Sequence, residues 1–505
     1  MPELTFSIDL HCHPQYKSFG KAHKDSDEQP EAQSASPSGK SSLWHYNPPS
    51  LTDKLLNIFL SVTKFSQTNL TASLYGRNMV LVVGLGATEQ AFFKNKLGTG
   101  IIGDLIDDFA AGFGRPRINT LQNLTDYWPD FMNEMKFMQE CENSPVNIDG
   151  HWFTYKLPKN FNELQQNIAD NEQPAAGSKS QPIIISLICA VEGLHILNCG
   201  LEKPCEPDEV KKHAKDLKKL PNRPWFVTFS HHFYNELCGH ARSLRKEIGK
   251  LTNQENGINS GFTAAGLDVL DILLDNTNND RILIDIKHMS PLSRQQYFEL
   301  LAGKYKNEEI PLIISHGVCN GLPAYGSHIS TYPLGEKFVN PLENIKGGDG
   351  NFKDHNMINF YDDEILKMVK SNGIIGLQLD ERRLASEETV RQIKHSLFRN
   401  KIMHYRSELV WNQVQYIAEL LDDNGLYAWG NMAIGSDYDG LVDPLNAFWT
   451  AEEFDDLAGY LERHAFNYFD KYPERIKNSI NKVNADKVIQ NIFHDNAWNF
   501  FRMWY

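Results

Sequence analysis

The sequence predicts a (β/α)8 TIM-like barrel with large loop insertions, and three observations support this prediction. Eight short β-rich runs recur along the 505 residues, and most of them are continuously apolar, as strands buried on both faces are. Helical patterns lie between the runs, and such alternation is typical of a parallel sheet. Most runs also end on His, Glu or Asp, and active sites of barrels lie at the carboxyl ends of strands. A doubly wound open sheet is the alternative fold.

The predicted strands are short and rich in branched apolar residues. In chain order they cover residues 5–10, 79–83, 183–190, 225–229, 282–286, 312–314, 374–377 and 432–434.

Helix signals fill the intervals between these strands. Ser50-Leu-Thr-Asp is a capping-type start, and apolar residues with helical spacing follow it over 55–60. Ser290-Pro291 places a capping Ser before a Pro in the first turn, so a helix is expected to continue through 295–301. The stretch 409–421 is amphipathic.

Three polar tracts interrupt the pattern, near residues 21–42, 170–181 and 331–356. Such compositions bury little apolar surface and indicate surface loops. Strand and helix patterns continue on both sides of each tract, so we expect one domain over 1–505 with these tracts as insertions. The third tract belongs to a long loop after the sixth strand, and we expect that loop to reshape the pocket.

Composition narrows the class of protein and its partners. The formal net charge is −14 and no basic stripe is visible, which argues against a nucleic-acid partner. Seven scattered Cys form no CxxC pair, which indicates a reducing compartment. The best apolar stretches, 79–87 and 183–191, are too short to span a membrane. The start of the chain has no signal-peptide pattern, so the expected location is cytoplasmic.

Side chains of the type that bind metals stand at six of the eight predicted strand ends. Following the first strand, His11 and His13 are two residues apart and point to the same side, where two neutral imidazoles can converge on a metal ion. The remaining ends carry Glu192, the pair His231 and His232, His288, His316 and Asp437. This set is too large for one tetrahedral zinc ion and suits a two-metal site with a bridging carboxylate.

Each of these residues also has a structural interpretation. A single His at a strand end is often a hydrogen-bonded structural residue. Glu192 could cap the helix that opens at Gly193, and Asp437 could begin a turn. The convergence of the whole set favours metal binding, because buried His and carboxylate groups without partners are costly.

Short motifs surround these residues in a consistent order. They are Asp9-Leu-His-Cys-His, Ala190-Val-Glu192-Gly, Thr228-Phe-Ser-His231, Leu283-Ile-Asp-Ile-Lys-His288-Met-Ser, Ile314-Ser-His316, Gly435-Ser-Asp437-Tyr-Asp-Gly and, near the end, Asp495-Asn496-Ala. This ordered series, which spans most of the chain, resembles the membrane (renal-type) dipeptidases of the amidohydrolase superfamily.

The resemblance implies a role for each residue. A first metal ion would be held by His11, His13 and Asp437, a second by His288 and His316, and Glu192 would bridge the two. His231 would face the substrate and stabilise oxyanion charge. The expected cofactors are two divalent metal ions, with zinc as the expected metal. The expected reaction is cleavage of a small amide or dipeptide by water that the metals activate, with Asp437 as the base that accepts and passes on its proton.

Two positions depart from the family pattern. His13 stands where the family's first motif usually has Asp, so the site loses one negative charge. Ile358 stands where an Arg is expected to grip the carboxylate of a dipeptide. Arg382 and Arg383, just after the seventh strand, are candidate substitutes for substrate binding.

Other functions stay open at this point. A hydrolase of the same superfamily that acts on a lactone, cyclic amide or phosphoester would share the metals and differ in the pocket. A binding or scaffold protein with a relict site is another candidate. Gly84-Leu-Gly86 hints at a dinucleotide fold, but Glu89 stands where GxGxxG requires its third Gly. The expected partner is a small molecule or dipeptide, and a homodimer is left open.

Overall fold

Parallel strands close into a barrel in the computed structural model, which describes residues 6–24, 28–60, 63–94, 112–172, 181–244, 252–326, 358–385 and 398–505. The eight barrel strands within these residues are β1 (Ser7–Cys12), β2 (Asn78–Leu85), β5 (Ile183–Glu192), β6 (Phe226–Thr228), β7 (Leu283–Asp285), β8 (Ile313–Gly317), β9 (Ile374–Leu377) and β10 (Met432–Ile434). The ring closes where β1 pairs with β10, with Asp9 opposite Ile434. The predicted (β/α)8 barrel is therefore confirmed, and the open sheet is wrong.

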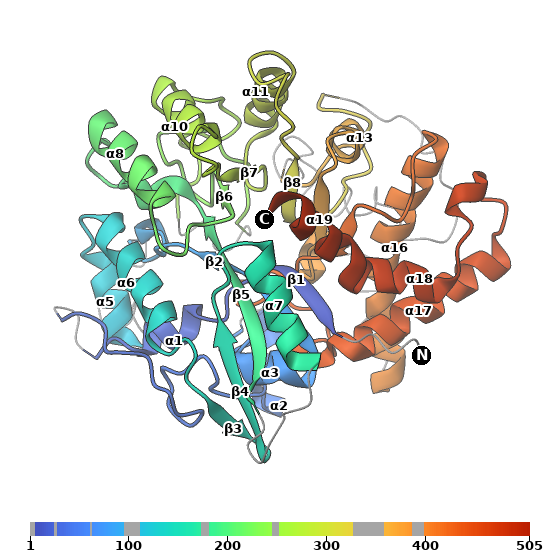
Figure 1. Ribbon diagram of the computed structural model, residues 1–505, viewed down its shortest axis with the longest axis horizontal. Coiled ribbons are helices and arrows are strands. Elements are labelled where there is room, and N and C mark those ends of the chain that lie inside the picture. The colour runs from blue at the N-terminus through green and yellow to red at the C-terminus, as the bar shows by residue number, and fades with distance from the viewer. Residues whose placement is uncertain are drawn as a thin grey trace.

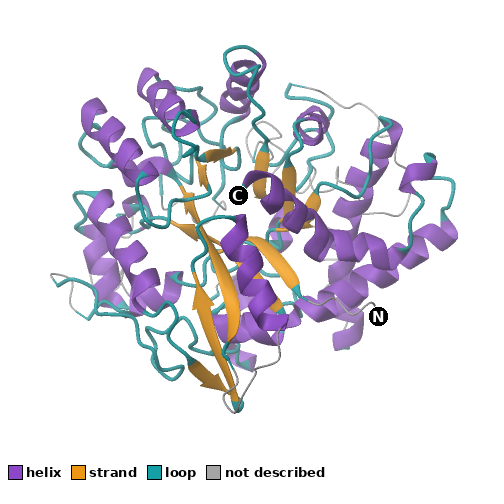
Figure 2. Cartoon of the chain, in the orientation of Figure 1, coloured by secondary structure: helices purple, strands orange, loops and turns teal. Residues whose placement is uncertain are grey.

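Helices surround the strands on the outside of the barrel (Figures 1 and 2). They are α1 (Tyr16–Lys21), α2 (Leu51–Leu60), α3 (Leu70–Tyr75), α5 (Arg115–Gln122), α6 (Tyr127–Glu140), α7 (Phe161–Glu172), α8 (Pro207–Lys218), α10 (Ala264–Leu274), α11 (Pro291–Ala302), α13 (Asp362–Lys370), α14 (Glu381–Leu384), α16 (Arg399–Asp423), α17 (Phe454–Lys471), α18 (Ala485–Gln490) and α19 (Asn496–Trp504). Across the described segments, no helix combines the length and apolar character that crossing a lipid bilayer requires.

The predicted helix starts lie where the capping signals placed them. Helix α2 begins after Ser50, whose Oγ accepts from the backbone N–H of Asp53 at 3.1 Å. Helix α11 begins after Ser290, whose Oγ accepts from the N–H of Ser293 at 3.0 Å, with Pro291 in the first turn. The amphipathic stretch 409–421 lies inside the longer helix α16.

A small hairpin beside the barrel is absent from the sequence prediction. Strand β3 (Val146–Ile148) pairs antiparallel with β4 (His151–Lys156), and β4 runs parallel to the start of β5. Strand β3 has only three residues, and β4 begins with two exposed side chains, so neither has the continuous apolar run that predicted the barrel strands.

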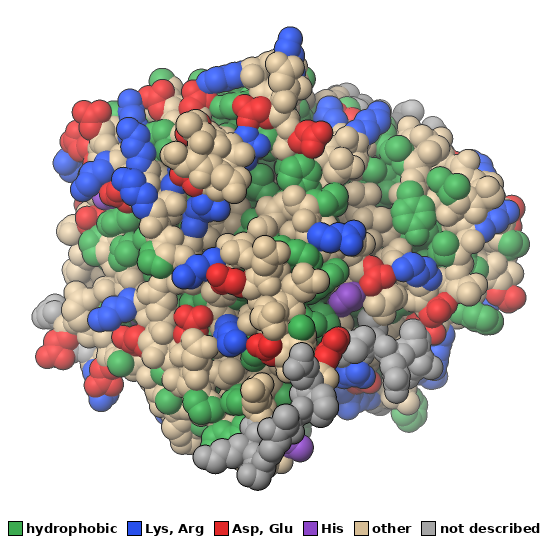
Figure 3. All heavy atoms as spheres, in the orientation of Figure 1, with side chains coloured by type: hydrophobic (Ala, Val, Ile, Leu, Met, Phe, Trp, Pro, Cys, Tyr) green, Lys and Arg blue, Asp and Glu red, His purple; other side chains and the backbone are tan. Residues whose placement is uncertain are grey.

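The insertions can be placed only in part. The tract 331–356 and residues 173–180 of the second tract lie outside the described residues. Residues 25–27 of the first tract also lie outside them. On the face of the molecule in Figure 3, Lys and Arg side chains are interspersed with Asp and Glu.

Helix α19 covers the amino-terminal end of the barrel and crosses the middle of the view in Figure 1. The ring of Trp225, just before β6, packs edge-on against Phe501 of α19 at 5.0 Å. Asn496 begins the helix, and its Nδ2 donates to the carbonyl of Met432, the first residue of β10, at 2.7 Å. The carboxyl ends of the strands therefore face the opposite side of the barrel.

Two buried aspartates join neighbouring strands near those carboxyl ends. Asp285 in β7 accepts from Thr228 Oγ1 of β6 at 2.7 Å and from Ser315 Oγ of β8 at 2.6 Å. Asp9 in β1 accepts from the backbone N–H of Ser436 at 2.9 Å, just after β10. Burial raises the pKa of Asp9 to about 6, although hydrogen bonds from Ser436 oppose this shift. These carboxylates fix how far each strand extends relative to its neighbours.

Replacing Asp285 with Ala should lower the free energy of unfolding by at least about 3 kcal/mol. The change leaves several buried donors without an acceptor, and each costs about 1–3 kcal/mol. Urea unfolding followed by circular dichroism measures the loss. Asp268→Ala, an exposed aspartate of α10 paired with Lys211, is the control and should change stability by no more than about 0.5 kcal/mol. A loss below about 1 kcal/mol for Asp285→Ala would contradict the role given to this carboxylate.

Candidate metal centre

Six of the side chains that the sequence singled out meet at the carboxyl end of the barrel. This ligand cluster consists of His11, His13, Glu192, His288, His316 and Asp437. Glu192 Oε1 lies 3.4 Å from His11 Nε2, 3.3 Å from His288 Nε2 and 3.5 Å from His316 Nε2. Positions far apart in the chain converge because each follows a strand of one closed ring.

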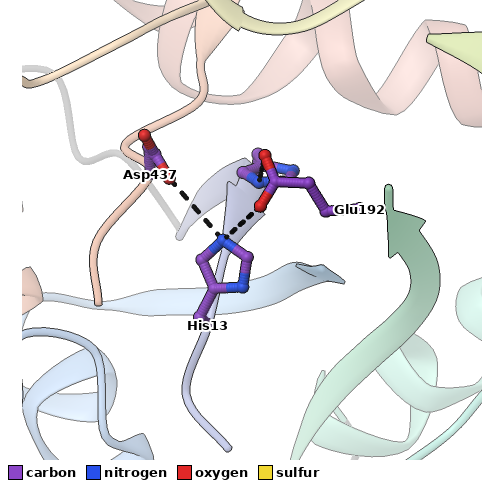
Figure 4. Close-up of side chains that lie close together, drawn as sticks. His13, Glu192 and Asp437 are labelled. Atoms are coloured by element: carbon purple, nitrogen blue, oxygen red, sulfur yellow. Dashed lines mark ion pairs between the residues drawn. The ribbon is translucent and has the colours of Figure 1, made fainter. Parts of the chain in front are cut away.

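The second carboxylate, Asp437, faces the cluster from the end of β10. Asp437 Oδ1 lies 3.6 Å from His13 Nε2, and Oδ2 lies 3.7 Å from His316 Nε2. His13 also lies 3.2 Å from Glu192 Oε2. Figure 4 shows His13 between the two carboxylates, with dashed lines to both.

Glu192 occupies the middle of the cluster and is ionised. Burial alone would raise its pKa, but the nearby His231 and His11 outweigh burial and hold that pKa well below its usual range. One oxygen faces three imidazoles and the other faces His13 and His231. This arrangement suits a carboxylate that binds cations on both of its oxygens.

The imidazole nitrogens of the cluster fit a bound cation. The buried Nε2 atoms of His11, His13 and His316 have no hydrogen-bond partner among the described residues. The Nδ1–H of His13 donates to the carbonyl of Gly84 at 2.7 Å, so its Nε2 can present a lone pair to the centre. Buried acceptors left without a donor are costly, and imidazole nitrogens with carboxylate oxygens are the ligands that zinc and similar divalent ions take.

His316 is oriented by a hydrogen-bonded chain that begins at Asp285. Ser315 Oγ has one proton and donates it to Asp285 Oδ2 at 2.6 Å. The same Oγ, 2.9 Å from His316 Nδ1, therefore accepts from that ring nitrogen. The outer groups that hold a ligating His commonly fix its tautomer in this way.

The protonation of the histidines differs across the cluster. Burial lowers the pKa of His288 to about 3 and that of His316 well below its usual range, so both rings are neutral near pH 7. The pKa of His13 shifts in the opposite direction. Burial opposes the charge on this ring, but Asp437 and Glu192 outweigh burial and raise its pKa. A cation that binds His13 must therefore displace a proton.

The backbone is strained where two of these side chains are presented. His288 and Asp437 have φ of 63° and 60°, the left-handed region that non-Gly residues seldom adopt. Such strain is concentrated at functional sites. Gly440 leaves room for the Asp437 carboxylate, because a Cβ there would lie 2.0 Å from Oδ1.

His231 lies beside the cluster and is held by a residue that the sequence prediction missed. Its Nδ1 is 2.8 Å from Glu89 Oε2, and its Nε2 is 3.5 Å from Glu192 Oε2. Burial opposes the charge on His231, but Glu89 and Glu192 outweigh it and raise the pKa of the imidazole. Glu89 lies four residues after the end of β2. An acidic residue shortly after a strand end is the sequence feature that could have identified it.

Two further side chains near the cluster were also missed. His195 Nε2 lies 2.5 Å from the carbonyl of Ala87, and its ring stacks over His231 with centroids 6.1 Å apart. Gln378 follows β9 directly, and its Nε2 donates to Asp437 Oδ2 at 2.7 Å.

A cavity of about 420 Å³ opens beside the cluster. Its lining includes His13, Glu192 and His231 together with Tyr16, Phe92 and Leu441. This volume includes space that is open to solvent, so the cluster can be reached from outside.

The candidate substrate-binding arginines have other partners. Arg382 donates to both carboxylate oxygens of Asp380, at 2.8 and 2.5 Å, and to the carbonyl of Leu441 at 3.1 Å. Arg383 donates to the carbonyl of Ser243. The described lining of the cavity does not include either arginine, and Ile358 is buried. A role of Arg382 or Arg383 in substrate binding stays a prediction.

Comparisons with known proteins give structural relatives only. No protein-family model and no curated protein matches the chain. A metallopeptidase from Rhodobacter sphaeroides, solved with a phosphinate mimic of the dipeptide L-Ala-D-Ala, is 10% identical over 99% of both chains with a TM-score of 0.47. The dipeptidase AC, a metallopeptidase of family M19, is 11% identical over 87% of this chain and 90% of its own, with a TM-score of 0.45.

The probable dipeptidase PvdM from Pseudomonas aeruginosa is 12% identical over 87% of this chain and 88% of its own, with a TM-score of 0.45. By name, the three relatives are a dipeptidase, a probable dipeptidase and a metallopeptidase.

Zinc should stabilise the chelator-treated protein through the cluster. At free zinc about 100 times the Kd, we expect the free energy of unfolding to rise by about 2.7 kcal/mol. The rise should vanish in the double variant His11→Ala, His316→Ala, whose rings stack at 4.1 Å. The control is His404→Ala, His464→Ala, a second stacked pair at 4.7 Å between α16 and α17. An equal rise in both double variants would contradict metal binding at the cluster.

Proposed function

We propose that this protein is a binuclear metal-dependent hydrolase that cleaves a small amide or peptide substrate in the manner of a dipeptidase. The observation that carries the proposal is the convergence of four imidazoles with two carboxylates, Glu192 and Asp437, in one cluster beside a cavity of about 420 Å³. The cluster would hold two divalent ions, with zinc as the expected metal. His11, His13 and Asp437 would serve one ion, His288 and His316 the other, and Glu192 would contact both.

When bound, two such cations lower the pKa of an attacking water and polarise the carbonyl of the substrate. The protein's own groups would then move the proton. Asp437 Oδ1 faces the cluster beside His13, so this carboxylate would accept the proton of the water and deliver it to the leaving nitrogen.

His231 would stabilise the negative charge that develops on the carbonyl oxygen of the substrate. Glu89 and Glu192 raise the pKa of His231 and so favour its protonated form, and the ring lines the cavity while its Nδ1 side stays with Glu89. A donor fixed before the reaction stabilises an oxyanion without reorganisation. The role of Glu89 would be to hold this ring in place.

A hydrolase for a lactone, cyclic amide or phosphoester is the second candidate. The described cavity lining favours it, because neither Arg382 nor Arg383 belongs to that lining and both guanidinium groups donate to protein oxygens. Initial rates on matched panels of dipeptides, lactones, cyclic amides and phosphotriesters separate the candidates. Turnover confined to dipeptides supports the first candidate, and turnover confined to the other panels supports the second. A zinc-loaded protein that hydrolyses no substrate overturns both.

At saturating zinc, Asp437→Asn should lose most of its turnover while the remaining ligands of the cluster still hold metal. We expect kcat to fall about 10²- to 10⁴-fold, the usual contribution of a general base, since an amide cannot accept the proton. Steady-state kinetics and elemental analysis of the same sample give the two readouts. Asp423→Asn, an exposed aspartate paired with Lys477, is the control with the same chemical change. Full activity in Asp437→Asn would rule out this residue as the base.

A further inference from the structure

Gln378 links the cluster to a buried lysine behind it. The glutamine is 3% exposed, and its Nε2–H donates to Asp437 Oδ2 at 2.7 Å. On the other side, its Oε1 accepts from Lys287 Nζ at 3.2 Å. Lys287 follows β7 and is fully buried. One amide therefore connects the ends of β7, β9 and β10.

The two neighbours determine which way the amide of Gln378 faces. Lys287 Nζ supplies N–H donors toward the glutamine, and the carboxylate oxygen Oδ2 of Asp437 accepts on the other side. The oxygen of Gln378 must therefore face Lys287 and its NH2 must face Asp437. A Met of similar length could make neither bond, and an ionised Glu could not donate to Asp437.

The Asp437 carboxylate is held at one oxygen and has space at the other. Oδ2 accepts from Gln378, and Gly440 leaves room for Oδ1, because a Cβ at Gly440 would lie 2.0 Å from it. In this orientation Oδ1 is directed at His13, whose Nε2 lies 3.6 Å away. Rotation of the carboxylate would break the bond to Gln378.

We propose that Gln378, with Lys287 behind it, is a positioning residue that holds the Asp437 carboxylate in the orientation needed to bind metal and accept a proton. The inference rests on the proposed function, which gives Asp437 those two roles. With Oδ2 occupied by the glutamine, Oδ1 is the oxygen left to face the reacting groups. Groups that orient a metal ligand commonly contribute about 10- to 100-fold to metal affinity or activity.

Cobalt binding tests the proposal without depending on turnover. The chelator-treated protein is titrated with Co²⁺, the visible ligand-field spectrum is recorded, and the Kd is measured by competition with a chelator. Gln378→Met removes both hydrogen bonds and keeps the length of the side chain. Gln413→Met is the matched control, because Gln413 is a buried glutamine of α16 that accepts from the N–H of Cys319 at 2.9 Å.

We expect Gln378→Met to weaken Co²⁺ binding about tenfold or more and to shift the ligand-field spectrum, while Gln413→Met changes neither. Lys287→Met keeps Gln378 but removes the donor to its Oε1, so it should give a smaller change in the same direction. If Gln378→Met does not fold, Lys287→Met replaces it in the test. Kd values and spectra equal to those of Gln413→Met would overturn the positioning role alone. A wild-type protein that binds no Co²⁺ would instead overturn the proposed function.

Discussion

Glu192 is a buried carboxylate whose two oxygens face five imidazole rings, and the site depends on this one contact set. The rings come from the ends of four strands, so Glu192 can meet them only if the barrel closes and its strands end at the same level. The hydrogen bonds of Asp9 and Asp285 between neighbouring strands set that level. The packing of the barrel therefore constrains the chemistry of the site, because a shift of β1, β6, β7 or β8 would move an imidazole away from Glu192.

The sequence predicted those parts of the molecule that follow from local pattern. Buried strands have continuous apolar runs, and a polar residue directly after such a run, such as His316 or Asp437, stands out. The hairpin of β3 and β4 has no such run. Glu89 was missed because it lies four residues beyond β2, in a loop whose path brings it to His231. The role of Gln378 is set by tertiary contacts with Lys287 and Asp437, and no spacing in the chain reveals them.

The wall of the cavity bears on which substrate the site accepts. The cavity lining combines polar side chains of the cluster with the largely apolar side chains of Tyr16, Phe92 and Leu441. Arg382 lies directly behind this wall, bound to the carbonyl of Leu441 and to Asp380. Through these hydrogen bonds, Arg382 links the loop after β9 to the loop that contains Leu441. In the proposed reaction the cluster acts on the scissile bond, whereas the rest of the cavity lining contacts the rest of the substrate and so selects it.

The most direct test of the account is a crystal structure of the zinc-soaked protein with anomalous data collected on both sides of the zinc absorption edge. The account predicts two anomalous peaks within the cluster, both beside Glu192, with imidazole nitrogens at about 2.0–2.1 Å from the ions. One peak should lie beside His11, His13 and Asp437, and the other beside His288 and His316. An anomalous map with no peak within the cluster, from crystals soaked in excess zinc, would contradict the account.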